Sequence, residues 1–306
     1  MTPFRKLAMC AVLLLLALQI RGGAQPAAPV RFDGGKAYDH VRAMVGFGPR
    51  PAGSAALAET RKYIREQMSA LGFKTEDQAF DADTPVGRLH MVNLRTTIPG
   101  TRPERLLITG HYDTKLYRQF RFVGANDARS SAAFLIELAR VLKGRKNPLT
   151  IELVFFDGEE ATLPGWDDAP NDHTYGSRYY AQTAKQTGDL ARIKAMILVD
   201  MIGDRDLNIR RESLSTPWLT DIIWATAREQ GYGALFPNDP MEVADDHMRF
   251  LEVGLPSVDI IDLDYSPWHT PGDTLDKVSA RSIEAVGRTL VAALPKIEAR
   301  LVGSAK

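Results

Sequence analysis

The sequence contains one cysteine, Cys10, and four tryptophans among 306 residues, and its 38 basic residues balance 38 acidic ones. A single cysteine cannot form a disulfide within the chain, so the apolar core and any bound metal have to stabilise the fold. Balanced charge gives no electrostatic reason to expect nucleic acid or an anionic membrane as a partner. We therefore predict that the protein has no nucleic-acid partner.

Long hydrophobic runs are also missing. The longest, residues 7–18, is shorter than the roughly 20 residues that cross a bilayer. It follows Arg5 and Lys6 and precedes small residues at positions 22–24, a pattern typical of a secretory signal peptide. We predict a signal peptide over residues 1–24 and a secreted or periplasmic protein without stable membrane association after cleavage. An uncleaved anchor is the alternative.

Cleavage would remove the cysteine, three basic residues and no acidic residue, which leaves a net charge of about −3. The full chain is 44% hydrophobic, and about 280 residues would remain after cleavage, enough for one substantial core. We expect a flexible leader over residues 25–36 and a single α/β domain over residues 37–306.

Short β-branched runs alternate with helical patterns along this domain. The predicted strands, several of them apolar on both faces, cover residues 91–96, 105–110, 150–157, 195–200 and 257–262. The best-marked helices run from a cap at Ser54 to Gly72, over residues 131–143, and from Ser279 onward. Such alternation predicts a three-layer α/β fold with a mixed, mostly parallel central sheet.

Polar residues of metal-binding type follow each predicted strand from the second onward. They are His111–Asp113, Asn126–Asp127, Glu159–Glu160, Asp200, and Trp268–His269. Taken singly, Asp127 could cap a helix that begins near Ala128, and adjacent glutamates are usually solvated. Sites in open α/β sheets form at the carboxyl ends of strands, however, so all five groups can converge. Their convergence favours a metal site.

Several motifs occur in a fixed order between residues 38 and 300. They are Gly110-His111-Tyr112-Asp113, Gly124-Ala125-Asn126-Asp127, Phe156-Asp157-Gly158-Glu159-Glu160, Tyr175-Gly176-Ser177-Arg178, Val199-Asp200-Met201-Ile202-Gly203, Asp245-Asp246-His247 and Trp268-His269-Thr270. This ordered set resembles the superfamily of zinc aminopeptidases and glutaminyl cyclases. The resemblance implies a zinc-aminopeptidase-like fold and two competing activities.

In the first activity, a glutaminyl cyclase converts the N-terminal glutamine of a peptide or protein to pyroglutamate with release of ammonia. The resemblance implies one Zn²⁺, held by Asp127, Glu160 and His269. In the second, a dizinc aminopeptidase hydrolyses the first peptide bond, and a second zinc also uses His111 and Asp200. Glu159 would move protons in either reaction. The set of metal ligands alone does not distinguish the cyclase from the aminopeptidase. A non-enzymatic binding domain is a third interpretation.

Details around the ligands favour the cyclase. Lys115 after the first motif, Trp166 shortly after Glu160, and Trp268 before the last histidine all resemble the cyclase pattern. Asn126 and Asp259 depart from it, since cyclases usually carry threonine and animal cyclases carry histidine there. Because of these departures, the aminopeptidase activity remains the alternative.

By resemblance, the catalytic residues are Glu159, Asp200 and Asp245. The predicted substrate-binding residues are Lys115, Trp166, Tyr265 and Trp268. Signal cleavage would expose Gln25, so we hypothesise that the protein carries its own pyroglutamate, which an intact-mass measurement would test. The sequence leaves the oligomeric state open.

Overall fold

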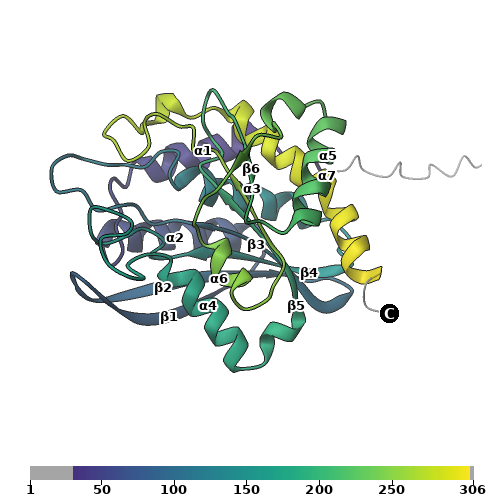
Figure 1. Cartoon of the computed structure of the whole chain (residues 1–306), viewed down its shortest axis with the longest axis horizontal. Helices are drawn as coiled ribbons and strands as arrows, with labels where there is room; N and C mark the ends of the chain where they lie inside the picture. The colour runs from purple at the N-terminus through teal and green to yellow at the C-terminus, as the bar shows by residue number, and fades with distance from the viewer. Residues whose placement is uncertain (1–29, 304–306) are drawn as a thin grey trace, which may run out of the picture. The chain divides into compact units, whose positions relative to one another are not determined.

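A computed structural model describes residues 30–303, and residues from Arg31 onward pack into one unit around a central sheet (Figure 1). Its strands are β1 (Thr75–Thr84), β2 (Gly87–Ile98), β3 (Arg102–His111), β4 (Leu149–Phe156), β5 (Ile193–Asp200), β6 (Arg211–Glu212), β7 (Pro240–Met241) and β8 (Ser257–Ile261). Its α-helices are α1 (Gly34–Val45), α2 (Ala55–Ala70), α3 (Arg129–Leu142), α4 (Tyr175–Gln186), α5 (Pro217–Glu229), α6 (His247–Leu251) and α7 (Ala280–Gly303).

The main sheet has six strands in the order β1-β2-β4-β3-β5-β8. β4, β3, β5 and β8 are parallel, whereas β2 pairs antiparallel with both β1 and β4. The predicted mixed, mostly parallel sheet is therefore confirmed. β1 was not predicted, because its sequence is polar and only Phe80 and Ala82 within it are buried. It forms the edge of the sheet, where one face stays in water.

Helices cover both faces of the sheet, which confirms the three layers. Along β3, Leu106 and Ile108 belong to the core beneath α1, α2, α3, α5 and α7. Leu107 points to the opposite face and packs with Tyr180 of α4 and Phe250 of α6. Successive strand residues face opposite sides, so a strand between two helical layers needs an unbroken apolar run. Each fully buried Leu or Ile contributes about 1.5–3 kcal/mol.

The helix boundaries follow local signals in the sequence. The Ser54 hydroxyl accepts a hydrogen bond from Leu57 N (3.2 Å) and begins α2, as predicted. Gly72 follows the helix at φ +86°, a conformation that glycine adopts without steric cost. α1 corrects the expected leader, because Asp33 caps it and residues 34–36 form its first turn. No helix within residues 30–303 is long and apolar enough to cross a membrane. The predicted signal peptide and residues 25–29 lie outside the described residues.

Candidate metal centre

The parallel strands carry the candidate residues to one edge of the sheet. His111 ends β3, Asp200 ends β5, and Glu159 and Glu160 lie in the loop just after β4. In the register of the sheet, His111 pairs with Phe156 at the end of β4, and Asp200 pairs with Ile261 at the end of β8. Strand direction alone therefore brings these distant parts of the sequence together.

Asp127 lies at the centre of the site, in the loop before α3. Its Oδ1 atom is 3.2 Å from His111 Nε2, and its Oδ2 atom is 3.3 Å from His269 Nε2. The same nitrogen of His269 is 3.3 Å from Glu160 Oε1. The reading of Asp127 as a helix cap is wrong, because Ala128 occupies the cap position of α3 and no side chain caps the helix.

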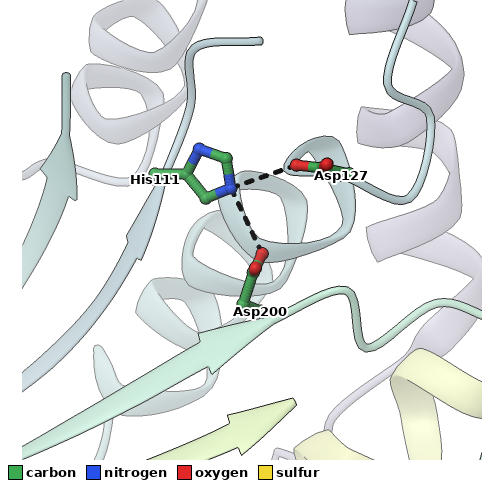
Figure 2. A group of neighbouring side chains, drawn as sticks. All are labelled: His111, Asp127 and Asp200. Carbon is green, nitrogen blue, oxygen red and sulfur yellow. Dashed lines mark ion pairs between the residues drawn. The ribbon is translucent and has the colours of Figure 1, made fainter. Parts of the chain in front are cut away.

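Two overlapping groups of ligand-type atoms share this carboxylate. Asp127, Glu160 and His269 offer atoms that all lie within 4.8 Å of one another, and so do His111, Asp127 and Asp200. Figure 2 shows the second group, in which His111 Nε2 faces both Asp127 and Asp200 Oδ1 at 3.3 Å. The structure thus brings together every residue of the predicted first site and of the alternative second site.

The charges of the first group suit a bound cation. Burial lowers the pKa of His269, but Glu160 and Asp127 outweigh it and raise that pKa to about 10. Although burial opposes ionisation of Asp127, hydrogen bonds from His111 and His269 hold its pKa well below the usual range. Glu160 Oε2 is buried without a hydrogen-bond partner. Imidazole nitrogen and carboxylate oxygen are zinc ligands, so the donor set fits zinc.

The backbone at His269 is strained in a way that places its ring. Its φ of +54° lies in the left-handed region, which costs a non-glycine residue about 1–3 kcal/mol. Trp268 stacks on the imidazole with ring centroids 4.2 Å apart, and Phe122 meets it edge-on at 5.8 Å. These aromatic contacts help to hold the ring between Asp127 and Glu160.

Asp113 and Lys115 orient the two glutamates. The Asp113 carboxylate accepts hydrogen bonds from Glu159 N (3.2 Å) and Glu160 N (3.3 Å). Lys115 N donates to Glu160 Oε1 (2.9 Å), and its ammonium group donates to Ala161 O (3.0 Å). Lys115, predicted as a substrate-binding residue, lines a cavity beside these ligands and also positions Glu160.

Asp273 holds the backbone of the loop that carries Asp127, a role that the sequence analysis missed. It accepts hydrogen bonds from Asn126 N (2.8 Å) and Asp127 N (3.1 Å). Tyr265 donates its hydroxyl to Asp273 Oδ1 (2.8 Å). Asp273 follows His269 by four residues in a Pro-Gly turn, and this proximity was the signal that could have found it. The expectation that Tyr265 lines the cavity is corrected, because its side chain is buried against Met201 and Ile261.

Replacing Tyr265 with phenylalanine should weaken metal binding about 10–100-fold, because residues that orient ligands commonly matter to that extent. The affinity can be measured by competition with a chromogenic chelator. Tyr232→Phe, away from the site, is the matched control. Equal affinities in the two variants would contradict the role of the Tyr265–Asp273 hydrogen bond.

A cavity of about 470 Å³ opens beside the candidate metal ligands. Trp166, Trp268, Asp200 and Asp245, all predicted as site residues, line it. Trp166 stacks on the His173 ring with centroids 4.1 Å apart. Burial and the neighbouring charge of Asp200 raise the pKa of Asp245 to about 7.

Asp259, the predicted departure from the animal cyclases, is fully buried. Its carboxylate is 3.7 Å from His247 Nδ1. Burial raises the pKa of Asp259 well above its usual range, and the charges of Asp245 and Asp200 add to this effect.

A mixed α/β sheet with imidazoles and a shared carboxylate at its carboxyl edge defines a metalloenzyme fold. Residues 93–294 match the profile of peptidase family M28, and the chain belongs to this family. This confirms the resemblance found in the sequence motifs.

Individual relatives agree with this assignment. A glutaminyl cyclase from an Acidobacteriales bacterium superimposes with a TM-score of 0.84 and 38% identity, covering 90% of this chain and 98% of its own. A leucine aminopeptidase precursor from Bacteroides thetaiotaomicron gives a TM-score of 0.80 and 25% identity, covering 87% and 98%. The glutaminyl-peptide cyclotransferase of Drosophila melanogaster is 29% identical over 74% of this chain and 70% of its own.

Proposed function

We propose that this protein cyclises the N-terminal glutamine of peptides and proteins to pyroglutamate. The main support is the division of labour between two adjacent glutamates. Glu160 faces His269, whereas Glu159 lies 3.6 Å from His111 Nδ1 and lines the cavity. One glutamate can thus hold a metal while the other stays free to carry a proton. The similarity to named glutaminyl cyclases supports the same activity.

The reaction needs no external nucleophile. The α-amine of the substrate attacks its own γ-carbonyl carbon, a C–N bond forms within the new ring, and the bond to the side-chain nitrogen breaks to release ammonia. Glu159 takes a proton from the attacking amine and returns it to the leaving nitrogen. Burial, opposed by His111 but reinforced by Asp245, raises the pKa of Glu159 well above its usual range. A raised pKa suits a group that both accepts and donates a proton near neutral pH.

Asp127, Glu160 and His269 would hold one zinc ion. When bound, zinc supplies a Lewis acid that polarises the γ-carbonyl of the substrate. Asp200 and Asp245, both lining the cavity, would orient the attacking amine. Trp166 and Trp268 would restrict water at the reacting carbonyl, which matters because hydrolysis competes with cyclisation.

One experiment separates this proposal from its alternatives. Purified protein is assayed for ammonia and pyroglutamate from glutaminyl peptides, for hydrolysis of leucine anilide, and for zinc content. We expect ammonia release and about one zinc per chain. Two zinc ions with hydrolysis and no ammonia would establish the aminopeptidase instead, whereas inertness despite bound zinc would indicate a binding domain.

The aminopeptidase stays a candidate because His111, Asp127 and Asp200 also form a ligand-type group. The variant His111→Ala tests whether this second group holds metal. With a single zinc on the first group, we expect the variant to keep the zinc content of the unaltered protein. A fall from two ions to one would contradict the single-zinc proposal.

We also propose that the protein is exported to the periplasm or the extracellular medium, where peptide N-termini are its substrates. The predicted signal peptide supports this location, and N-terminal sequencing of the protein recovered outside the cytoplasm would test it. Recovery of full-length chain in the membrane fraction would favour the uncleaved anchor.

A further inference from the structure

A second cavity, of about 360 Å³, adjoins the candidate active-site cavity. We call it the apolar groove. Its lining consists of Val86, the five residues 116–120, and the three residues 162–164. Pro164 lines both cavities, and Leu116 directly follows Lys115, which lines the first one. The groove is therefore adjacent to the cavity in which the glutamine would react, and Pro164 forms part of the wall between them.

Tyr117 connects the groove to the candidate metal centre. Its ring stacks on Phe120 with centroids 4.4 Å apart and meets the ring of His269 edge-on at 6.0 Å. A ligand in the groove would thus lie within one or two residues of the reacting atoms, because an extended chain advances about 3.3–3.6 Å per residue.

The groove and the active-site cavity differ in chemical character. Val86 is 46% exposed and Leu116 is 42% exposed, and Trp268, at 41%, borders the active-site cavity. These are three of the six large hydrophobic side chains that are exposed within residues 30–303. Exposed apolar residues gathered in one place mark a binding surface. Arg118 carries the single charge among the groove-lining residues, whereas carboxylates dominate the other cavity.

The wall between the two cavities is held in place by Asp172. Its carboxylate accepts hydrogen bonds from Thr162 Oγ1 (2.7 Å) and from Leu163 N (2.8 Å). Tyr175 donates its hydroxyl to the same carboxylate (2.7 Å). A wall fixed in this way can bind a side chain without first having to be ordered.

We propose that the apolar groove binds the second and third residues of the substrate peptide and selects apolar side chains there. This inference rests on the proposed function, since the N-terminal glutamine has to occupy the acidic cavity. The rest of the peptide then extends past Pro164 into the groove, where its side chains contact Leu116 and Val86. A basic residue in the second position is disfavoured by Arg118.

The test compares kcat/KM for the amides Gln-Leu-Phe, Gln-Gly-Gly and Gln-Lys-Lys, with glutaminamide as the substrate that cannot reach the groove. We expect Gln-Leu-Phe to be preferred about tenfold over Gln-Gly-Gly, a typical gain for small apolar contacts. Leu116→Ser should remove most of this preference and leave glutaminamide turnover unchanged. Leu214→Ser, which alters a side chain 37% exposed outside the groove, is the matched control.

Each outcome separates this inference from the proposed function. If glutaminamide and all three peptides are cyclised equally well, the groove proposal is wrong and the cyclase stands. A preference that survives Leu116→Ser also overturns it. If no glutaminyl substrate is cyclised, the proposed function fails. Equilibrium binding of the same peptides to Leu116→Ser and Leu214→Ser then shows whether the groove binds peptide.

Discussion

Exchanging Glu159 for glutamine is expected to lower kcat for cyclisation by about 10²–10⁴-fold, the usual contribution of a positioned general acid–base group. Glutamine keeps the shape of the side chain but cannot take a proton from the amine and return it to the leaving nitrogen. Glu159 belongs to neither group of candidate metal ligands, so zinc content should not change. Ammonia release under substrate saturation and metal analysis measure the two quantities.

Glu242→Gln provides the matched control for this prediction. Glu242 lines the same cavity, but it is exposed and outside both candidate metal groups. Glu242→Gln removes one carboxylate from the cavity, as Glu159→Gln does, so a purely electrostatic effect would appear in both variants. Comparable losses in the two variants, or a loss of zinc from Glu159→Gln, would refute the assignment of Glu159 as the proton carrier.

Exchanging Asp127 for asparagine is expected to have the second large effect, a loss of bound zinc together with a fall in kcat/KM of about 10³-fold or more. The estimate follows from the several kcal/mol that a Lewis-acidic metal contributes to a transition state. Asp127 is common to both groups of ligand-type atoms, so the variant should lose zinc whether the protein binds one ion or two. Zinc per chain and cyclisation rate are measured on the same preparation.

Asp239→Asn, an exposed aspartate outside the cavity, controls for the loss of one negative charge. Thermal unfolding with and without added zinc shows whether the Asp127 variant folds. If that variant folds and still retains the normal amount of zinc, the candidate metal centre has been placed on the wrong residues.

Much of the fold could be predicted because its signals are local. The strand from Ile193 to Asp200 is largely apolar and buried, and it ends in Asp200, a carboxylate that lines the cavity. Ser54 caps its helix through a contact three residues away. The five groups of polar residues were found because the ends of parallel strands share one edge of the sheet, a rule that requires no knowledge of side-chain packing. The set of metal ligands among them came from the family resemblance.

The missed features depend on partners that the sequence does not place. α1 begins with Gly34 and Gly35, which are poor helix formers, and it packs against α3 and α7. Tyr265 precedes the Trp268–His269 pair and looks like a cavity wall, but its hydroxyl is committed to Asp273. Tertiary contacts determine whether a side chain such as Tyr265 faces the cavity or supports the loop that carries a metal ligand.

The carboxylate of Asp127 presents one oxygen to each imidazole. A cation bound at one position would therefore draw on the same negative charge that a second cation needs, and the two cations would repel each other across a few ångströms. Loading would be anticooperative, with the second ion entering only at higher free-metal concentration. The number of ions found in a preparation would then report the surrounding medium as well as the residues of the protein.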